Sequence, residues 1–122
     1  MHMKENVLYN KAYAFAIRVV RAYQYLGQEK REFILAKQLL RSGTSIGANV
    51  AEANGAISDA EFSSKLSIAY KECLETKYWT DLLKDTGYID EKQHRSLFTD
   101  ADELGKMLFS SIRTTRGIKT DK

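Results

Sequence analysis

Apolar side chains recur at alternating steps of three and four residues in four successive segments of the chain, which is the spacing of helices with one buried face. The 122-residue sequence also contains no proline. Because proline interrupts the hydrogen bonds of a helix interior, its absence favours long, uninterrupted helices. The sequence therefore predicts an all-α protein, and its length fits one domain around a single hydrophobic core.

The apolar stripes, together with the helix start and stop residues between them, determine the expected helix boundaries. Gly27 is the predicted end of the first helix, since glycine accepts the left-handed conformation that often follows a helix. Ser58 with Glu61, and Asp90 with Gln93, have the spacing of capping boxes and predict the starts of the last two helices. The expected helices cover residues 6–27, 32–55, 59–86 and 91–114.

Four helices joined by short links favour an antiparallel up-down-up-down four-helix bundle. We expect residues 1–115 to form this bundle and residues 116–122 to form a flexible basic tail. The second helix should bury an apolar stripe that runs from Phe33 to Ile57.

The second expected helix contains unusually small side chains. Gly43, Gly47 and Ala51 follow one another every four residues, so one side of this helix is almost bare backbone. Glycine costs a helix interior roughly 1 kcal/mol relative to alanine, and close tertiary packing must offset that cost. The segment is therefore predicted to be a packing or binding surface.

Polar side chains at several positions of the second and third helices are of the types that form hydrogen-bonded networks inside bundles. Our hypothesis is that Glu52 or Glu75 accepts a charge-assisted bond from Arg41 or its neighbours, between these two helices or at a subunit boundary. In the alternative, they are ordinary exposed residues. The residues in question are Arg41, Asn49, Glu52, Glu75 and Tyr78.

Tyr78 and Trp79 lie about 100° apart around their helix, so both cannot face the centre of one bundle. Either a second subunit covers the remainder, or these aromatic rings widen the face that points to the core.

Positive charge is concentrated in the first half of the sequence and at its end. Residues 1–57 carry eight Lys/Arg against four Asp/Glu, residues 58–112 carry seven against eleven, and residues 113–122 carry four against one. This distribution is compatible with nucleic-acid binding, although a solvated face is the commoner explanation. The candidate nucleic-acid residues are Arg18, Arg21, Lys30, Arg31, Arg41, Arg113, Arg116 and Lys119.

The sequence gives little support for an active site or a metal site. A di-iron bundle needs two Glu-x-x-His motifs, and Glu91 to His94 provides one, in the first turn of a helix. Glu72 and Glu75 share a helix face but have no partner for acid–base chemistry. Cys73, the single cysteine, is predicted to be a core residue. We expect no catalytic residue, no metal and no cofactor.

No apolar run approaches the roughly 18 residues of a membrane span, and the N-terminus lacks the apolar region of a secretion signal. We therefore expect a cytoplasmic protein that does not bind membranes.

Two long motifs resemble the signature of a known family. Residues 39–53 (LLRSGTSIGANVAEA) and 62–79 (FSSKLSIAYKECLETKYW), with Gly87-Tyr88-Ile89, are similar to the bacterial four-helix-bundle proteins first noted in intervening sequences of 23S ribosomal RNA genes. The resemblance covers most of residues 7–112. It implies a homopentameric ring with a central opening and a role with nucleic acid. A more distant relative in diversity-generating retroelements is a pentamer that binds reverse transcriptase and nucleic acid, and we do not carry that partner over.

From the residues and the resemblance together we expect a non-enzymatic oligomeric scaffold for protein interaction. Binding of RNA or DNA through basic surfaces of the oligomer is the alternative. Besides the basic candidates, the residues expected to serve structure or assembly are Gly43, Gly47, Asn49, Ala51, Glu52, Glu75, Tyr78 and Trp79.

Overall fold

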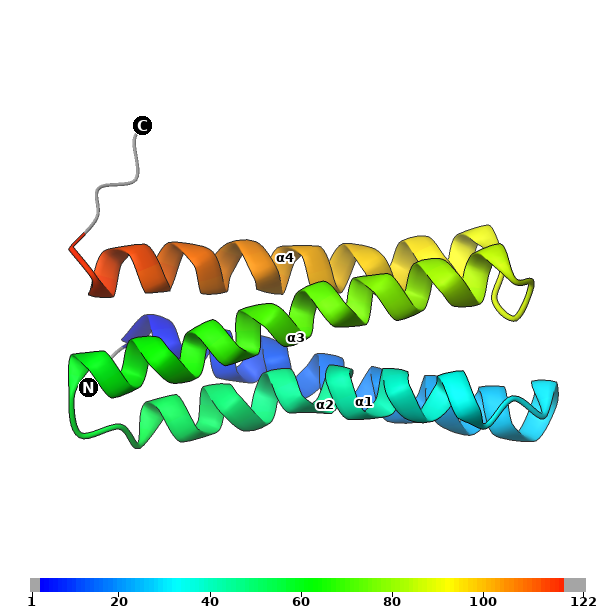
Figure 1. Ribbon diagram of the computed structural model, residues 1–122, viewed down its shortest axis with the longest axis horizontal. Coiled ribbons are helices and arrows are strands. Elements are labelled where there is room, and N and C mark those ends of the chain that lie inside the picture. Colours follow the sequence, from blue (N-terminus) through cyan, green and yellow to red (C-terminus); the bar gives the residue numbers. More distant parts are fainter. Residues whose placement is uncertain (1–2, 118–122) are drawn as a thin grey trace.

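Four helices run in alternating directions along one long axis (Figure 1). The computed structural model describes residues 3–117, and side chains from residue 7 onward. The helices are α1 (Met3–Lys30), α2 (Ile34–Asn54), α3 (Asp59–Asp85) and α4 (Glu91–Thr115). Each packs on the next in the chain, whereas α1 and α4 make a smaller contact. The predicted all-α four-helix bundle is confirmed.

The apolar stripes meet in one core. The largest fully buried side chains include Phe15, Leu39, Leu66 and Leu104, one from each helix. Because the i, i+3 and i+4 positions share a helix face, these stripes determine which side of each helix turns inward. The apolar stripes expected on α3, from Phe62 to Leu83, and on α4, from Leu97 to Ile112, are buried throughout.

The prediction that α2 buries an apolar stripe from Phe33 to Ile57 is wrong at both ends. Phe33 is 50% exposed and Ile57 is 95% exposed. Phe33 is the N-cap residue of α2, and Ile57 lies in the link after the helix, so neither follows the helical spacing.

Gly27 does not end α1, which continues to Lys30. The left-handed residue is Arg31, with a φ of 57°. Gly27 instead makes room for a neighbour, because a Cβ at this position would lie 3.1 Å from Cε1 of Phe33. The glycine thus serves packing and not helix termination.

Both predicted cap residues begin their helices as expected. Ser58 Oγ accepts a hydrogen bond from the Glu61 backbone N–H at 3.1 Å, and Asp90 and Gln93 form a complete capping box. The Glu61 carboxylate accepts from the N–H of Ile57 at 3.0 Å, one residue before the expected donor. These bonds satisfy backbone donors that have no partner in the first helical turn.

Helix α4 ends at Thr115, one residue beyond the expected boundary. Most of the predicted tail, residues 118–122 with Lys119 among them, lies outside the described residues. Within the described part of the chain, none of the helices has both the length and the apolar character needed to cross a membrane.

Candidate interaction surfaces

The small side chains of α2 face two different environments. Gly43 and Gly47 are buried against α1. A Cβ on Gly43 would lie 2.7 Å from Cγ2 of Val19, and one on Gly47 would lie 3.5 Å from the carbonyl oxygen of Ala12. The two glycines therefore allow close packing of α1 on α2 within one chain.

Ala51 is exposed, unlike the two glycines. It follows Gly47 by four residues, which places it about 40° farther around α2. Ala48 is also exposed, and Thr44 is half-buried. Together Thr44, Ala48 and Ala51 form a shallow surface, which we call the α2 small-residue strip.

Helix α1 carries large apolar side chains on its outer side. Tyr13, Ile17 and Val20 are 56%, 45% and 38% exposed, and their spacing of four and three residues places them on one face. We call these three residues the α1 outer stripe. Tyr9 extends it, since its ring stacks on Tyr13 with centroids 6.0 Å apart.

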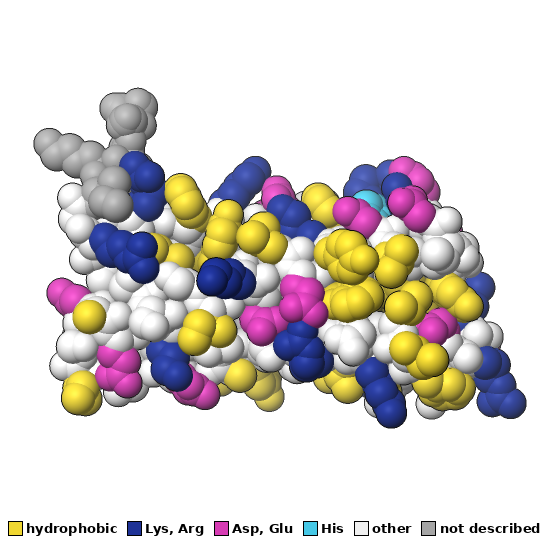
Figure 2. Space-filling model, in the orientation of Figure 1, with side chains coloured by type: hydrophobic (Ala, Val, Ile, Leu, Met, Phe, Trp, Pro, Cys, Tyr) yellow, Lys and Arg dark blue, Asp and Glu magenta, His cyan; other side chains and the backbone are white. Residues whose placement is uncertain are grey.

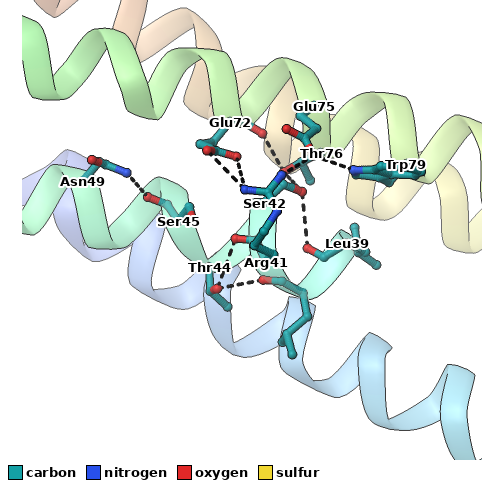
Figure 3. A network of polar contacts seen from close by, with 11 residues as sticks. Leu39, Arg41, Ser42, Thr44, Ser45, Asn49, Glu72, Glu75, Thr76 and Trp79 are labelled. Atoms are coloured by element: carbon teal, nitrogen blue, oxygen red, sulfur yellow. Dashed lines mark hydrogen bonds and ion pairs between the residues drawn. The ribbon is translucent and has the colours of Figure 1, made fainter. Parts of the chain in front are cut away.

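A polar network joins α2 to α3 (Figure 3). Arg41 of α2 forms ion pairs with Glu75 and, at 3.4 Å, with Glu72. Trp79 Nε1 donates to Glu75 Oε2 at 2.9 Å. The Arg41–Glu75 pair that was considered from the sequence is thus present.

The electrostatics of the network follow from these bonds. The hydrogen bond from Arg41 lowers the pKa of Glu75, and the bond from Trp79 acts in the same direction. Glu75 in turn raises the pKa of Arg41. The side chains of Arg41 and Glu75 are 48% and 36% exposed, so this network lies at the surface and not inside the bundle as expected.

Among the described residues, the other predicted members make no hydrogen bond or ion pair with Arg41. Asn49 donates to the carbonyl of Ser45 in its own helix at 2.9 Å, and Glu52 pairs with Lys65 at 2.8 Å. Tyr78 is 58% exposed and places its ring in an edge contact with Trp79, at 4.9 Å between centroids. Their role in assembly stays a prediction.

Several of the basic candidates have partners within the chain. Arg18 pairs with Asp100 at 2.5 Å and donates to Ser96 Oγ at 2.6 Å, and Arg41 pairs with the two glutamates. Arg113 lies over the Phe109 ring, 5.5 Å from its centroid.

Arg116 donates to Ser63 and Ser67 at 2.8 and 3.3 Å. Its guanidinium is thereby fixed at the start of α3. Within residues 3–117 no carboxylate pairs with Arg116, whereas carboxylates oppose the charges of Arg18 and Arg41.

The candidates do not form one patch. Lys30 ends α1 and Arg31 follows it at one end of the bundle, whereas Arg113 and Arg116 lie at the end of α4, at the opposite end of the molecule (Figure 1). The 25 residues of α4 span about 37 Å at 1.5 Å per residue, which separates the two groups.

A groove of about 470 Å³ opens between α1 and α4. Arg21 and Lys92 line it together with Tyr25, over apolar residues that include Leu26 and Leu97. Lys92 was not among the basic residues predicted from the sequence, since no spacing rule connects residues on the first and last helices.

A second groove, of about 280 Å³, lies between α3 and α4 and was also missed. Tyr70, Leu74 and Phe109 are its large apolar residues, and we call it the α3–α4 groove. Leu74 and Phe109 are 47% and 48% exposed. In Figure 2 apolar side chains gather over this part of α3 and α4, with basic side chains around them.

Cys73 and His94, which were considered for catalysis or metal binding, are buried or bonded to a neighbouring side chain. Cys73 is buried, and desolvation raises the pKa of its thiol to about 12, so it stays protonated near neutral pH. His94 Nε2 lies 2.7 Å from Asp81 Oδ1. The described residues contain no group of three or more side chains placed to hold a metal ion.

Comparisons with known proteins agree with the fold. Residues 4–110 match a family model described as 23S rRNA-intervening sequence protein. A solved structure from Bacteroides thetaiotaomicron VPI-5482, a protein of unknown function from the S23 ribosomal protein family, is 50% identical with a TM-score of 0.89. The match covers 91% of this chain and 99% of that one. A comparison with curated proteins gives no match.

Proposed function

Since the chain belongs to the 23S rRNA-intervening sequence protein family, we propose that it is a non-enzymatic, homo-oligomeric scaffold for protein interaction. The proposal rests on the surfaces of this chain, because the similar solved structure is itself described as having unknown function. The observation that carries it is the α1 outer stripe, in which three large apolar side chains are more than a third exposed.

Self-association is the economical way to cover this stripe. Fully burying an aliphatic or aromatic side chain contributes about 1.5–3 kcal/mol. The α2 small-residue strip provides a shallow surface on which the large side chains of another copy can pack. Contact between two different surfaces of identical chains gives a closed ring where the rotation between subunits closes, and an open filament where it does not. The proposed number of subunits, five, comes from the family resemblance.

A role without catalysis is supported by the state of the carboxylates. Glu72 and Glu75, the pair considered for acid–base chemistry, both accept from Arg41. Because this contact lowers the pKa of Glu75, the group suits an ion pair better than proton transfer near neutral pH.

The test places a charge in the proposed interface. Ile17→Glu is expected to convert the assembly to monomers in sedimentation velocity, because a carboxylate would have to be buried without a partner. Ile34→Glu is the matched control, since Ile34 is 76% exposed at the start of α2 and lies outside both surfaces. Circular dichroism verifies that both variants fold. An unchanged sedimentation coefficient for a folded Ile17→Glu variant would refute the proposed interface.

Nucleic-acid binding is the second candidate, favoured by the end of the bundle where α1 stops. There Arg21, Lys30, Arg31 and Lys92 have no ion-pair partner among the described residues. An oligomer would repeat this group several times and strengthen a weak contact.

The measurement for this candidate is fluorescence anisotropy with a labelled ribosomal RNA fragment and a single-stranded DNA. If binding is real, affinity should fall steeply between about 50 and 200 mM salt, and Arg21→Ala with Lys92→Ala should weaken it. Truncation after Thr115 tests the separate contribution of the C-terminal cations. Absence of binding at the lower salt concentration rejects the idea.

A further inference from the structure

Large apolar side chains of both helices line the α3–α4 groove. Tyr70 and Leu74 are one helical turn apart on α3, and Phe109 of α4 lies opposite, with 5.8 Å between the ring centroids of Tyr70 and Phe109. Gly105 lies at the base of the groove, where there is room for an added methyl group, because a Cβ there would lie 3.9 Å from Cβ of Cys73. Half-exposed apolar side chains therefore flank a narrow depression.

The edge of this groove is basic. Lys77 and Lys106 both bond to Asp102, at 2.8 and 3.4 Å, and Asp102 is the single carboxylate that lines it. Lys71, three residues before Leu74, is exposed and has no ion-pair partner among the described residues. Arg113 is held over the Phe109 ring. Among the lining residues themselves, two lysines face one carboxylate, so the groove carries a net positive charge around an apolar centre.

We propose that the α3–α4 groove binds an acidic amphipathic helix of a partner protein. A helix presents apolar residues at i, i+3, i+4 and i+7 to such a groove, and acidic residues on its flanks would meet the basic edge. This inference rests on the proposed scaffold function and names the chemistry of its partner.

Charge and chemistry favour this occupant over others. A second copy that docks by the α1 outer stripe would bring Arg21, which lies one helical turn after Ile17 on α1, towards a basic edge. Like charges placed together at an interface are unfavourable. Single-stranded nucleic acid prefers basic channels with stacking rings, whereas Leu74 and Asp102 occupy this groove with an aliphatic group and a carboxylate.

The probe is a labelled, designed helical peptide with leucines at i, i+3, i+4 and i+7 and glutamates on both flanks. Its control has every glutamate replaced by lysine. Anisotropy titration of the full chain should give a dissociation constant below about 100 μM for the acidic peptide. Affinity should fall about fivefold between roughly 50 and 200 mM salt, as expected for exposed charges. The lysine peptide should bind at least tenfold more weakly.

Substitutions in the α3–α4 groove test whether the acidic peptide binds there. Leu74→Glu should weaken the acidic peptide at least tenfold, and Lys71→Glu with Lys106→Glu should weaken it about fivefold at low salt. Ile34→Glu, on α2 and away from the groove, should leave it unchanged. Circular dichroism again verifies folding. Failure of the acidic peptide to bind, insensitivity to Leu74→Glu, or tighter competition by a single-stranded oligonucleotide would overturn the proposal.

Sedimentation of the same samples separates this inference from the scaffold proposal. Intact oligomers that do not bind the acidic peptide would overturn the groove assignment alone. Monomers that bind it would overturn the assembly and leave the groove assignment standing.

Discussion

Two glycines of α2 pack on α1 at different distances, so the same substitution should have opposite effects. At Gly43 an alanine Cβ would lie 2.7 and 2.8 Å from both γ-carbons of the buried Val19. Because both branches clash, rotation of the valine does not relieve the contact. At Gly47 the nearest atom is 3.5 Å away, which is an ordinary van der Waals distance.

We predict that Gly43→Ala lowers the free energy of unfolding by about 1–3 kcal/mol, because overpacking outweighs the helical preference of alanine. Gly47→Ala should raise it by up to about 1 kcal/mol. Urea denaturation of the two variants measures both values. Equal stabilisation by the two alanines would show that α1 does not approach Gly43 as closely as described.

Glu75 links stability to pH. Its pKa is lower in the folded chain, chiefly because of Arg41, than in the unfolded chain, where the ordinary value is about 4.3. The stabilisation is therefore fully present above that value and is lost as the pH falls through the lower folded pKa.

Glu75→Gln should accordingly reduce the free energy of unfolding by about 0.5–1 kcal/mol at pH 7, with a difference that shrinks towards zero below about pH 4. Denaturation at several pH values measures this, and Trp79 fluorescence reports the local contact. A difference that stays constant down to pH 3 would contradict the ion pair.

At the scale of the helices, ion pairs connect α2 to α3 at two places, and we expect the two to differ in strength. A double-mutant cycle on Arg41→Met and Glu75→Gln should give a coupling energy of about 0.5–1 kcal/mol, since Glu75 also accepts from Trp79. The matched cycle on Lys65→Met and Glu52→Gln should give less, because Glu52 is 58% exposed and has a single partner. Equal coupling in the two cycles would argue against a network around Glu75.

Local signals predicted the helices well. Apolar spacing is visible within a few residues of sequence. The caps formed by Ser58 and Asp90 likewise involve residues only three positions later, so the sequence indicates these features directly. Gly27 and Phe33 were misjudged for one shared reason. Their roles depend on each other across a tight link, and no local rule distinguishes a glycine that ends a helix from one that admits a ring.

The candidate surfaces were less predictable. The types of side chain in the Arg41–Glu75 network were identified, but their exposure was not, because exposure depends on how far α2 and α3 separate at the surface. The α3–α4 groove was missed because Leu74 and Phe109 are 35 positions apart in sequence and become neighbours only through helix packing.

For the whole molecule, the proposed assembly surface and the proposed partner groove lie on different helices. The α1 outer stripe and the α2 small-residue strip belong to the first two helices, whereas the α3–α4 groove belongs to the last two. An assembled ring that uses the first pair would therefore leave the groove of every subunit available, and several copies of a partner helix would bind one oligomer.

The molar mass of the purified chain in solution tests the central claim most directly. Multi-angle light scattering during size-exclusion chromatography at micromolar concentration is predicted to give about 70 kDa, the mass of five 13.9 kDa chains. Another closed oligomer would correct the number of subunits and keep the self-association. A single species of 13.9 kDa at that concentration would contradict the proposal that the chain functions as a homo-oligomeric scaffold.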